Sequence, residues 1–197
     1  MKLKGIKLFW IYMFIAIITA MALLDIYIHD FRTVIPNQVY RSRQLSGQQL
    51  IKTVDEYRLK SILNLRGAHP GDDWYNHEVN VSKQNHIQHY NISLDSNTLP
   101  TPSQFRKLVH IIGTAPRPLL VHCESGVDRS GLASAISILL ANGSLQHAKR
   151  QVSWHYFVFK HESTGKQFFR SYDAWLTKHK IEKSSREHFL QWLSQYR

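Results

Sequence analysis

Short strand-like segments alternate with amphipathic segments along most of the chain. Strands are predicted at residues 39–42, 62–65, 87–94 and 118–122. Helices are predicted at residues 46–57, 74–84, 102–113, 129–141, 144–152, 165–179 and 185–195. Such alternation is typical of an α/β fold in which helices cover a mainly parallel sheet. The length allows one domain of about 150 to 170 residues and a short appendage.

The longest apolar segment lies near the N-terminus. It runs without charge from residue 8 to residue 24, after three lysines, and carries no polar stripe. This pattern predicts that residues 1–30 form a membrane anchor with its positive flank in the cytoplasm. The rest of the chain would then be exported, to the periplasm in a Gram-negative bacterium. Because Ala20-Met21-Ala22 also fits a signal-peptide cleavage site, a secreted or periplasmic domain is the alternative.

The charge of the chain indicates what kind of partner it binds. The chain carries a formal charge of +11, and residues 146–197 hold ten Lys and Arg against four Asp and Glu. This excess predicts an anionic partner or surface. Aromatic residues interleave with the cations: Trp154, Tyr156, Phe157, Phe159, Phe168, Phe169, Trp175 and Trp192. The pattern suits a membrane interface or a helical tail with a solvated face, and no nucleic-acid partner is predicted because no recognised binding motif is present.

The single cysteine lies in the segment with the clearest chemistry. One thiol excludes a disulfide framework and a zinc site built on paired thiolates. Residues 119–131 read Leu-Leu-Val-His-Cys-Glu-Ser-Gly-Val-Asp-Arg-Ser-Gly, which predicts a buried strand, a tight loop and a helix start. Such a loop points backbone N–H groups inward and forms an anion site, with Gly126 at its turn. These groups favour the thiolate of Cys123, and Arg129 can grip two oxygens of a phosphate.

The pattern His-Cys-x-x-Gly-x-x-Arg-Ser-Gly resembles the signature of the protein tyrosine phosphatase superfamily. The resemblance covers residues 37 to about 155 and points to the dual-specificity branch, of a bacterial type that is membrane-anchored or exported. It implies a three-layer α/β fold, a catalytic domain at 31–197 with a basic, aromatic-rich helical C-terminal part, and no metal or other cofactor. The residues expected to bind the substrate phosphate are Cys123, Glu124, Ser125, Gly126, Val127, Asp128 and Arg129.

The resemblance also implies supporting roles around the cysteine. Ser130 is expected to hydrogen-bond the sulfur and help it leave, and His122 is expected to orient the loop rather than act as a base. The family uses an aspartate on an upstream loop as general acid, and Asp95 fits because it follows a predicted strand. Asp128 is the alternative acid, since myotubularin-type lipid phosphatases have Asp at this position of a similar loop.

Two other groups of polar residues are assigned no chemistry. Asp72 and Asp73 follow a Pro-Gly turn and are interpreted as part of a solvated loop. His86 and His89 are interpreted as a surface pair rather than as metal ligands, and the remaining histidines are scattered along the chain.

The resemblance implies hydrolysis of phosphomonoesters through a cysteinyl-phosphate intermediate. The expected substrate is phosphotyrosine in a protein, with phosphoserine and phosphothreonine as further substrates. The alternative is an anionic phospholipid or an inositol phosphate, which the predicted anchor, the basic C-terminal part and Asp128 favour. A catalytically idle phosphate-binding module and a rhodanese-like sulfur transferase are the other classes, and the intact set of Cys, Arg and Ser argues against both.

Overall fold

The computed structural model describes residues 2–28 and 31–197. The chain divides into two compact units, Met1–Asp30 and Phe31–Arg197. In the first unit, α1 (Lys2–Ile28) is one continuous helix of 27 residues, and its side chains at positions 8–21 are exposed.

The helix α1 does not meet the requirements of a membrane span. Among the described residues, no helix combines the length and the apolar character that crossing a bilayer needs. The prediction of a membrane anchor, on which the predicted localisation rested, is therefore wrong.

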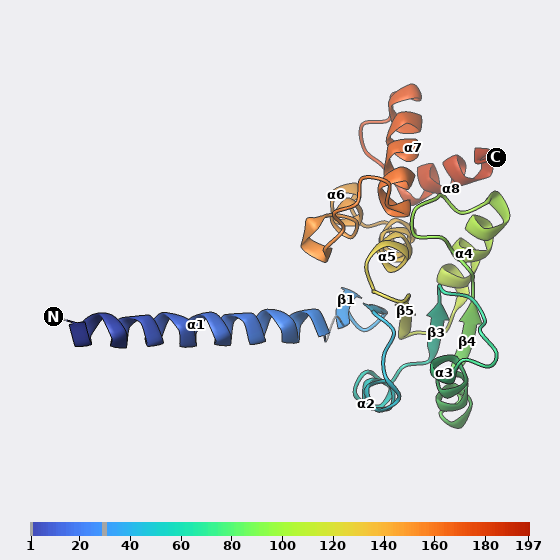
Figure 1. Ribbon diagram of the computed structural model, residues 1–197. Helices are drawn as coiled ribbons and strands as arrows, with labels where there is room; N and C mark the ends of the chain where they lie inside the picture. The colour runs from blue at the N-terminus through green and yellow to red at the C-terminus, as the bar shows by residue number, and fades with distance from the viewer. Residues whose placement is uncertain (1, 29–30) are drawn as a thin grey trace. The chain divides into compact units, whose positions relative to one another are not determined.

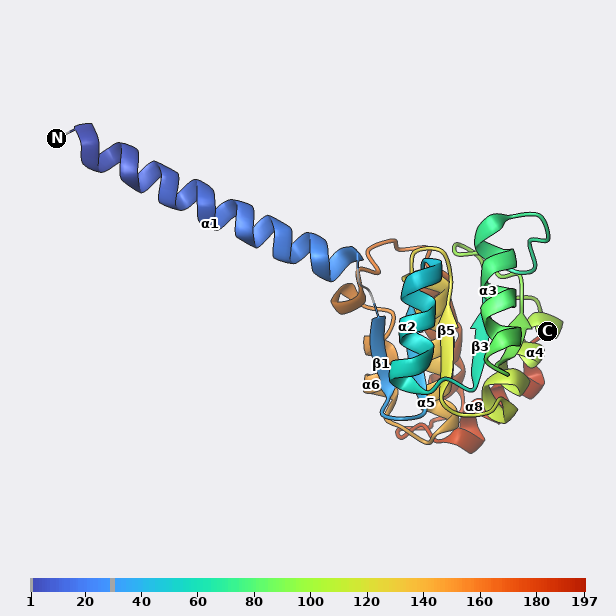
Figure 2. The ribbon, with the colours of Figure 1, turned by 90° about the horizontal axis from the view of Figure 1, so that it is seen from below.

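A five-stranded sheet lies at the centre of the second unit (Figures 1 and 2). Its strands, in spatial order, are β1 (Phe31–Ile35), β2 (Val39–Ser42), β5 (Leu119–His122), β3 (Ser61–Asn64) and β4 (Gln88–Asn91). The strands β2, β5, β3 and β4 are parallel, whereas β1 is antiparallel to β2. The sheet is therefore mixed, which corrects the prediction of a mainly parallel sheet.

The observed strands differ from the predicted ones in two ways, and the first of them makes the sheet mixed. The strand β1 was not predicted, and it forms a hairpin with β2 through a turn in which Asn37 has a φ of 58°. Strands joined by so short a turn must run antiparallel. The strand β4 is also shorter than the predicted 87–94, and the residues after it form a loop that contains Asp95.

Helices cover both faces of the sheet. Figure 1 shows α2 (Gly47–Tyr57) and α3 (Asp73–Gln84) on one face and α4 (Pro102–Thr114) and α5 (Asp128–Leu140) on the other. The remaining helices follow α5: α6 (Leu145–Arg150), the 3-10 helix η1 (Trp154–Tyr156), α7 (Thr164–Lys178) and α8 (Arg186–Gln195). The fold is thus α/β, with a mixed sheet flanked by helices.

Alternation of side chains along the strands divides the core between these two faces. In β3, Ile62 packs in a cluster with residues of α2 and α3, whereas its neighbour Leu63 packs in a second cluster with α4 and α5. The helix α5 is buried from residue 130 to residue 139, because it also packs against α6, α7 and α8. This packing holds the first turn of α5 at the end of β5.

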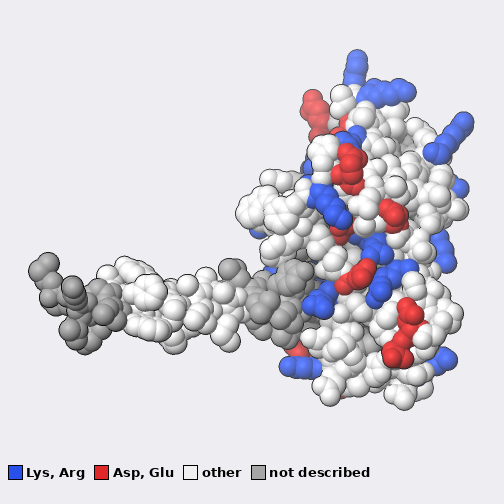
Figure 3. Space-filling model, in the orientation of Figure 1, with Lys and Arg blue, Asp and Glu red and all other residues white. Residues whose placement is uncertain are grey.

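The aromatic residues of the C-terminal part fall into two groups. Those of α7 and α8 are mostly buried and pack on one another and on α4: Phe168, Phe169, Tyr172, Phe189 and Trp192. Those between α6 and α7 include three exposed side chains: Trp154, Phe157 and Phe159. On the face shown in Figure 3, Lys and Arg are interspersed with Asp and Glu. The helices α7 and α8 therefore extend the core of the domain, as a helical tail with a solvated face does.

Candidate active site

The segment around the cysteine connects β5 to α5 at the carboxyl edge of the parallel strands. β5 ends at His122 and α5 begins at Asp128, so residues 123–127 make the turn between them. β5 lies between β2 and β3, and α/β folds place their ligands at the carboxyl ends of such strands. The start of α5 brings unpaired backbone N–H groups to the same edge. We call residues 123–129 the cysteine loop.

Glycine is required at position 126 of the cysteine loop. Gly126 has a φ of 74°, in the left-handed region that side chains resist. A Cβ atom there would lie 2.6 Å from the backbone nitrogen of Arg43 and 2.8 Å from the carbonyl carbon of Ser42. The loop therefore packs directly against the end of β2, and any larger residue would push the two apart.

A buried arginine holds the cysteine loop from behind. The side chain of Arg41, in β2, is 1% exposed. Its Nη2 donates hydrogen bonds to the carbonyl oxygens of Gly126 at 2.7 Å and Val127 at 2.9 Å. Its Nη1 donates to the carbonyl oxygen of Gln151 at 2.9 Å, and the guanidinium lies 4.4 Å from the ring centre of Tyr156. Arg41 thus ties the loop to the segment after α6.

These bonds fix the direction of the loop peptides. Because the N–H and C=O of a peptide group point in opposite directions, carbonyls bound to Arg41 leave the N–H groups of the same peptides pointing away from Arg41. Sequence reasoning placed Arg41 in a predicted strand and gave it no role. The available signal was a cation within a short strand, since such a charge is rarely buried without partners.

The cysteine itself lies at the base of the loop. Cys123 is a free thiol and its side chain is 1% exposed. Ser130, one residue beyond the loop, is fully buried, and its Oγ donates to the carbonyl oxygen of Ser42 at 3.4 Å. The predicted bond from Ser130 to the sulfur therefore stays a prediction, and the observed bond ties α5 to β2.

Arg129 lies at the mouth of the loop with donors available. Its Nη1 donates to the carbonyl oxygen of Leu94 at 3.5 Å, and its Nη2 lies 3.8 Å from Oε2 of Glu124. The side chain of Glu124 is 71% exposed, so this ion pair is weak and points outward. The Nε–H group of Arg129 is buried and has no hydrogen-bond partner among the described residues. An anion in the loop would satisfy this group.

A buried carboxylate supports the residue before Cys123. Glu78, on α3, is 3% exposed. His122 Nε2 lies 3.1 Å from Oε2 of Glu78, His89 Nε2 lies 2.8 Å from Oε1, and Gln44 Nε2 donates to Oε2 at 2.8 Å. His89, interpreted from the sequence as one of a surface pair, is therefore a partner of this carboxylate. His122 is therefore held on the α3 side of the sheet, and its role in orienting the loop stays a prediction.

These contacts lower the pKa of Glu78. Burial by itself raises the pKa of a carboxyl group, but attraction to His122 and hydrogen bonds from His122, His89 and Gln44 outweigh it and hold the pKa well below its usual range. Sequence reasoning missed Glu78. The signal would have been an acidic residue on the inner face of the predicted helix 74–84, three positions before the buried Val81.

Asp95 follows a residue that contacts the arginine of the loop. It directly follows Leu94, whose carbonyl oxygen accepts from Arg129. Asp95 is exposed, and its Oδ1 accepts from the backbone N–H of Asn97 at 2.6 Å, an Asx turn that leaves Oδ2 outside that bond. The backbone N–H of Thr164, at the start of α7, donates to the carbonyl oxygen of Ser96 at 2.9 Å. The loop with Asp95 is therefore fixed at the edge of the site.

The other candidate acids differ in their surroundings. Asp128 is the first residue of α5 and is buried, and its Oδ1 has no hydrogen-bond partner among the described residues. Asp72 is exposed and accepts from Nε1 of Trp74 at 3.0 Å. Asp72 precedes α3 and Asp73 is its first residue, so both are exposed but Asp73 belongs to the helix and not to the predicted loop.

A strand, a loop around a cysteine and a helix that begins with arginine in its first turn define a cysteine-phosphatase type of site. A family model described as the tyrosine phosphatase family matches residues 25–149. The chain therefore belongs to the tyrosine phosphatase family. Members of this family are phosphoric monoester hydrolases. A comparison with curated proteins found no match.

Solved structures show the same fold. The core catalytic domain of the PP-IP phosphatase Siw14 from S. cerevisiae is 20% identical, with a TM-score of 0.56, and the match covers 79% of this chain and 95% of that one. Tk-PTP in its active form is 16% identical, with a TM-score of 0.53 and coverage of 77% and 96%. PTPMT1 is 15% identical, with a TM-score of 0.50 and coverage of 75% and 99%.

Proposed function

We propose that this protein hydrolyses phosphotyrosine in proteins, with phosphoserine and phosphothreonine as further substrates, through a cysteinyl-phosphate on Cys123. The observation that carries the proposal is the cysteine loop itself. Arg41 binds two of its carbonyls, and the buried Nε–H of Arg129 has no hydrogen-bond partner among the described residues. A phosphate dianion is the ligand that such a set of donors suits.

The first step transfers the phosphoryl group to sulfur. The thiolate of Cys123 attacks phosphorus, the S–P bond forms, and the bond from phosphorus to the leaving oxygen breaks. The carboxyl group of Asp95 gives its proton to that oxygen. Arg129 and the loop N–H groups stabilise the charge on the three remaining phosphoryl oxygens.

The second step releases phosphate. A water oxygen attacks phosphorus, the S–P bond breaks, and its electron pair returns to Cys123 as thiolate. The proton of the water passes to the carboxylate of Asp95, which restores the acid for the next cycle. His122, held by Glu78, positions the start of the loop, and Ser130 assists the departure of the sulfur.

A second candidate substrate is an inositol phosphate or the phosphate of an anionic lipid. The net charge of +11 supports it, and so does the likeness to Siw14, which is described as a PP-IP phosphatase. Asp128 also supports it, as a buried carboxylate with an unpartnered oxygen beside Arg129. In this reading Asp128 is the general acid.

Hydrolysis of p-nitrophenyl phosphate by the full chain, from pH 4.5 to 8 with a chelator present, tests the chemistry. Cys123→Ser is expected to abolish activity, and Asp95→Asn to lower kcat at least about 100-fold. Asp73→Asn, an exposed aspartate on α3, is the matched control and should retain full activity. If Asp95→Asn is unchanged and Asp128→Asn is impaired, Asp128 is the acid. An inactive but folded wild type contradicts the proposal.

A substrate comparison tests the finer claim. We expect kcat/KM for a phosphotyrosine peptide to exceed that for inositol phosphates and short-chain phospholipid phosphates by about a thousandfold. The reverse preference, with the same dependence on Cys123, would establish the second candidate.

A further inference from the structure

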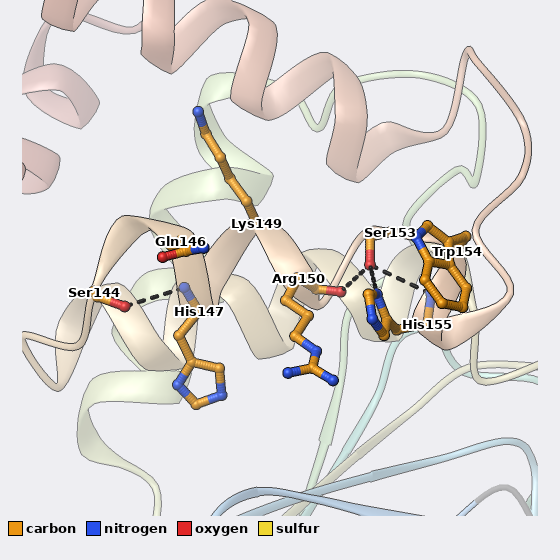
Figure 4. A pocket seen from close by; sticks show the side chains of 8 residues that line it. All are labelled: Ser144, Gln146, His147, Lys149, Arg150, Ser153, Trp154 and His155. Carbon is orange, nitrogen blue, oxygen red and sulfur yellow. Dashed lines mark hydrogen bonds between the residues drawn. The ribbon is translucent and has the colours of Figure 1, made fainter.

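A hollow outside the cysteine loop lies where α6, η1 and β1 meet. Its larger part has a volume of about 640 Å³ and is lined by eight residues between Ser144 and His155 (Figure 4). A smaller part of about 270 Å³ shares His147, Arg150 and His155 with it and adds Arg32 and Tyr156. Together they have the size of a small-molecule site, for which about 300 to 1,000 Å³ is typical.

The lining of this hollow is cationic. Arginine, lysine and histidine line its two parts, and no acidic side chain does so among the described residues. Lys149 is engaged with Asp173 at 2.7 Å. Arg150 is exposed, and within residues 31–197 its guanidinium has no carboxylate partner. An arginine in this state offers paired N–H donors to a phosphate.

The histidines beside Arg150 are placed to join it. Figure 4 shows the side chains of His147, Arg150 and His155 on the same side of the segment, with Lys149 pointing away from them. The ring of His155 stacks on Trp154 at 3.8 Å, and its Nδ1 lies 3.1 Å from Oγ of Ser153. These contacts orient one imidazole before any ligand binds, which lowers the entropy cost of binding.

The hollow is separate from the cysteine loop but adjoins its support. Pairing of β1 with β2 places Arg32 opposite Arg41, the residue that holds the loop. Tyr156 lines the hollow and lies against the guanidinium of Arg41 at 4.4 Å. The side chains of Tyr156 and Arg41 thus separate the hollow from the carbonyl oxygen of Gly126.

We propose that this hollow is a second anion site, which binds a small molecule with two or more phosphate groups. Arg150 and His155 bind one phosphate, and Arg32 and His147 bind the other. The volume exceeds the need of a single phosphate ion, since one water takes about 30 Å³. The site does not depend on turnover at Cys123.

The test uses methylenediphosphonate, whose P–C–P link resists hydrolysis, titrated calorimetrically into the full chain with Cys123→Ser. We expect two anions bound per chain. Arg129→Ala should remove the one in the cysteine loop. Arg150→Ala with His155→Ala should weaken the other at least about tenfold. Arg106→Ala, which removes an exposed arginine on α4, is the matched control and should retain both.

Two results would overturn the proposal. One is a single bound anion that disappears with Arg129→Ala. The other is a second anion whose affinity is the same in the Arg150→Ala, His155→Ala variant as in the Arg106→Ala control. The assay measures binding and not catalysis. Its result therefore does not depend on whether the protein hydrolyses phosphomonoesters as proposed.

Discussion

The cysteine loop is supported from both faces of the sheet, and the two supports have opposite charge. On the α5 side, the buried cation Arg41 donates to the carbonyls of Gly126 and Val127. On the α3 side, the buried anion Glu78 contacts His122, the residue before Cys123. An arginine stays charged at every pH that proteins meet, whereas a carboxylate can be protonated.

Arg41 and Glu78 therefore have different roles in supporting the loop. Arg41 binds the turn of the loop, so it sets the direction of the peptide groups that line the anion site. Glu78 contacts His122, the strand residue directly before the loop, so it sets the position of Cys123. The first support is insensitive to pH, and the second is lost when Glu78 gains a proton. Each can be broken without touching the other.

Loss of Arg41 should have the largest effect. Arg41→Ala leaves two loop carbonyls without their donor and opens a cavity, so we expect the free energy of unfolding to fall by about 4 kcal/mol. We expect kcat/KM for p-nitrophenyl phosphate to fall at least about 100-fold. Urea unfolding and steady-state kinetics measure the two. Arg41→Lys keeps the charge without the forked donors, and about half the loss of stability is expected.

Loss of Glu78 should matter less and should depend on pH. The folded-state pKa of Glu78 is lowered, while the unfolded value is about 4.3, so its stabilising contribution is fully present above about pH 5 and declines as pH falls below that. Glu78→Gln should lose about 2 kcal/mol of stability at pH 7. Its unfolding free energy should also fall less steeply than that of the wild type between about pH 5 and pH 3. Parallel pH profiles of unfolding for the two proteins would contradict this role.

Loss of the ring of Tyr156 should have the smallest effect. It tests how much the contact between this ring and Arg41 contributes to stability. The cation–π contact is worth about 1 kcal/mol, so Tyr156→Ala should lower the free energy of unfolding by about that amount. Tyr156→Phe keeps the ring face and should retain most of it. Thermal unfolding of the three proteins measures the difference. Equal losses for Ala and Phe would mean that the hydroxyl, which accepts from Gln151, carries the contribution.

The parts of the site that the sequence predicted lie within one short stretch. His122, Cys123, Gly126 and Arg129 follow one another from a strand into a helix, so their spacing by itself places them around one loop. Asp95 could be proposed only through the family resemblance, since its local sequence also predicts the Asx turn that it makes. That Leu94, the residue before Asp95, reaches Arg129 depends on the sheet, which sets two loops from different strands side by side.

Two features of the sequence could not be interpreted without the structure. The apolar run near the N-terminus matched the composition of a membrane span, but the described helix does not meet the length and apolar character required. The aromatic and basic pattern of residues 146–197 could not distinguish a lipid-facing surface from a core-facing one. Both give a helix with one apolar face, and only the packing of Phe168 and Trp192 on Phe105 decides for the core.

The sequence by itself determined the class of fold, the order of most strands and helices, and the cysteine loop, because each depends on residues that are neighbours along the chain. The tertiary structure decided what holds that loop. Arg41 reaches Gly126 across 85 positions, and Glu78 reaches His122 across 44. A buried charge is stable only with partners, and those partners become neighbours only when the sheet has formed.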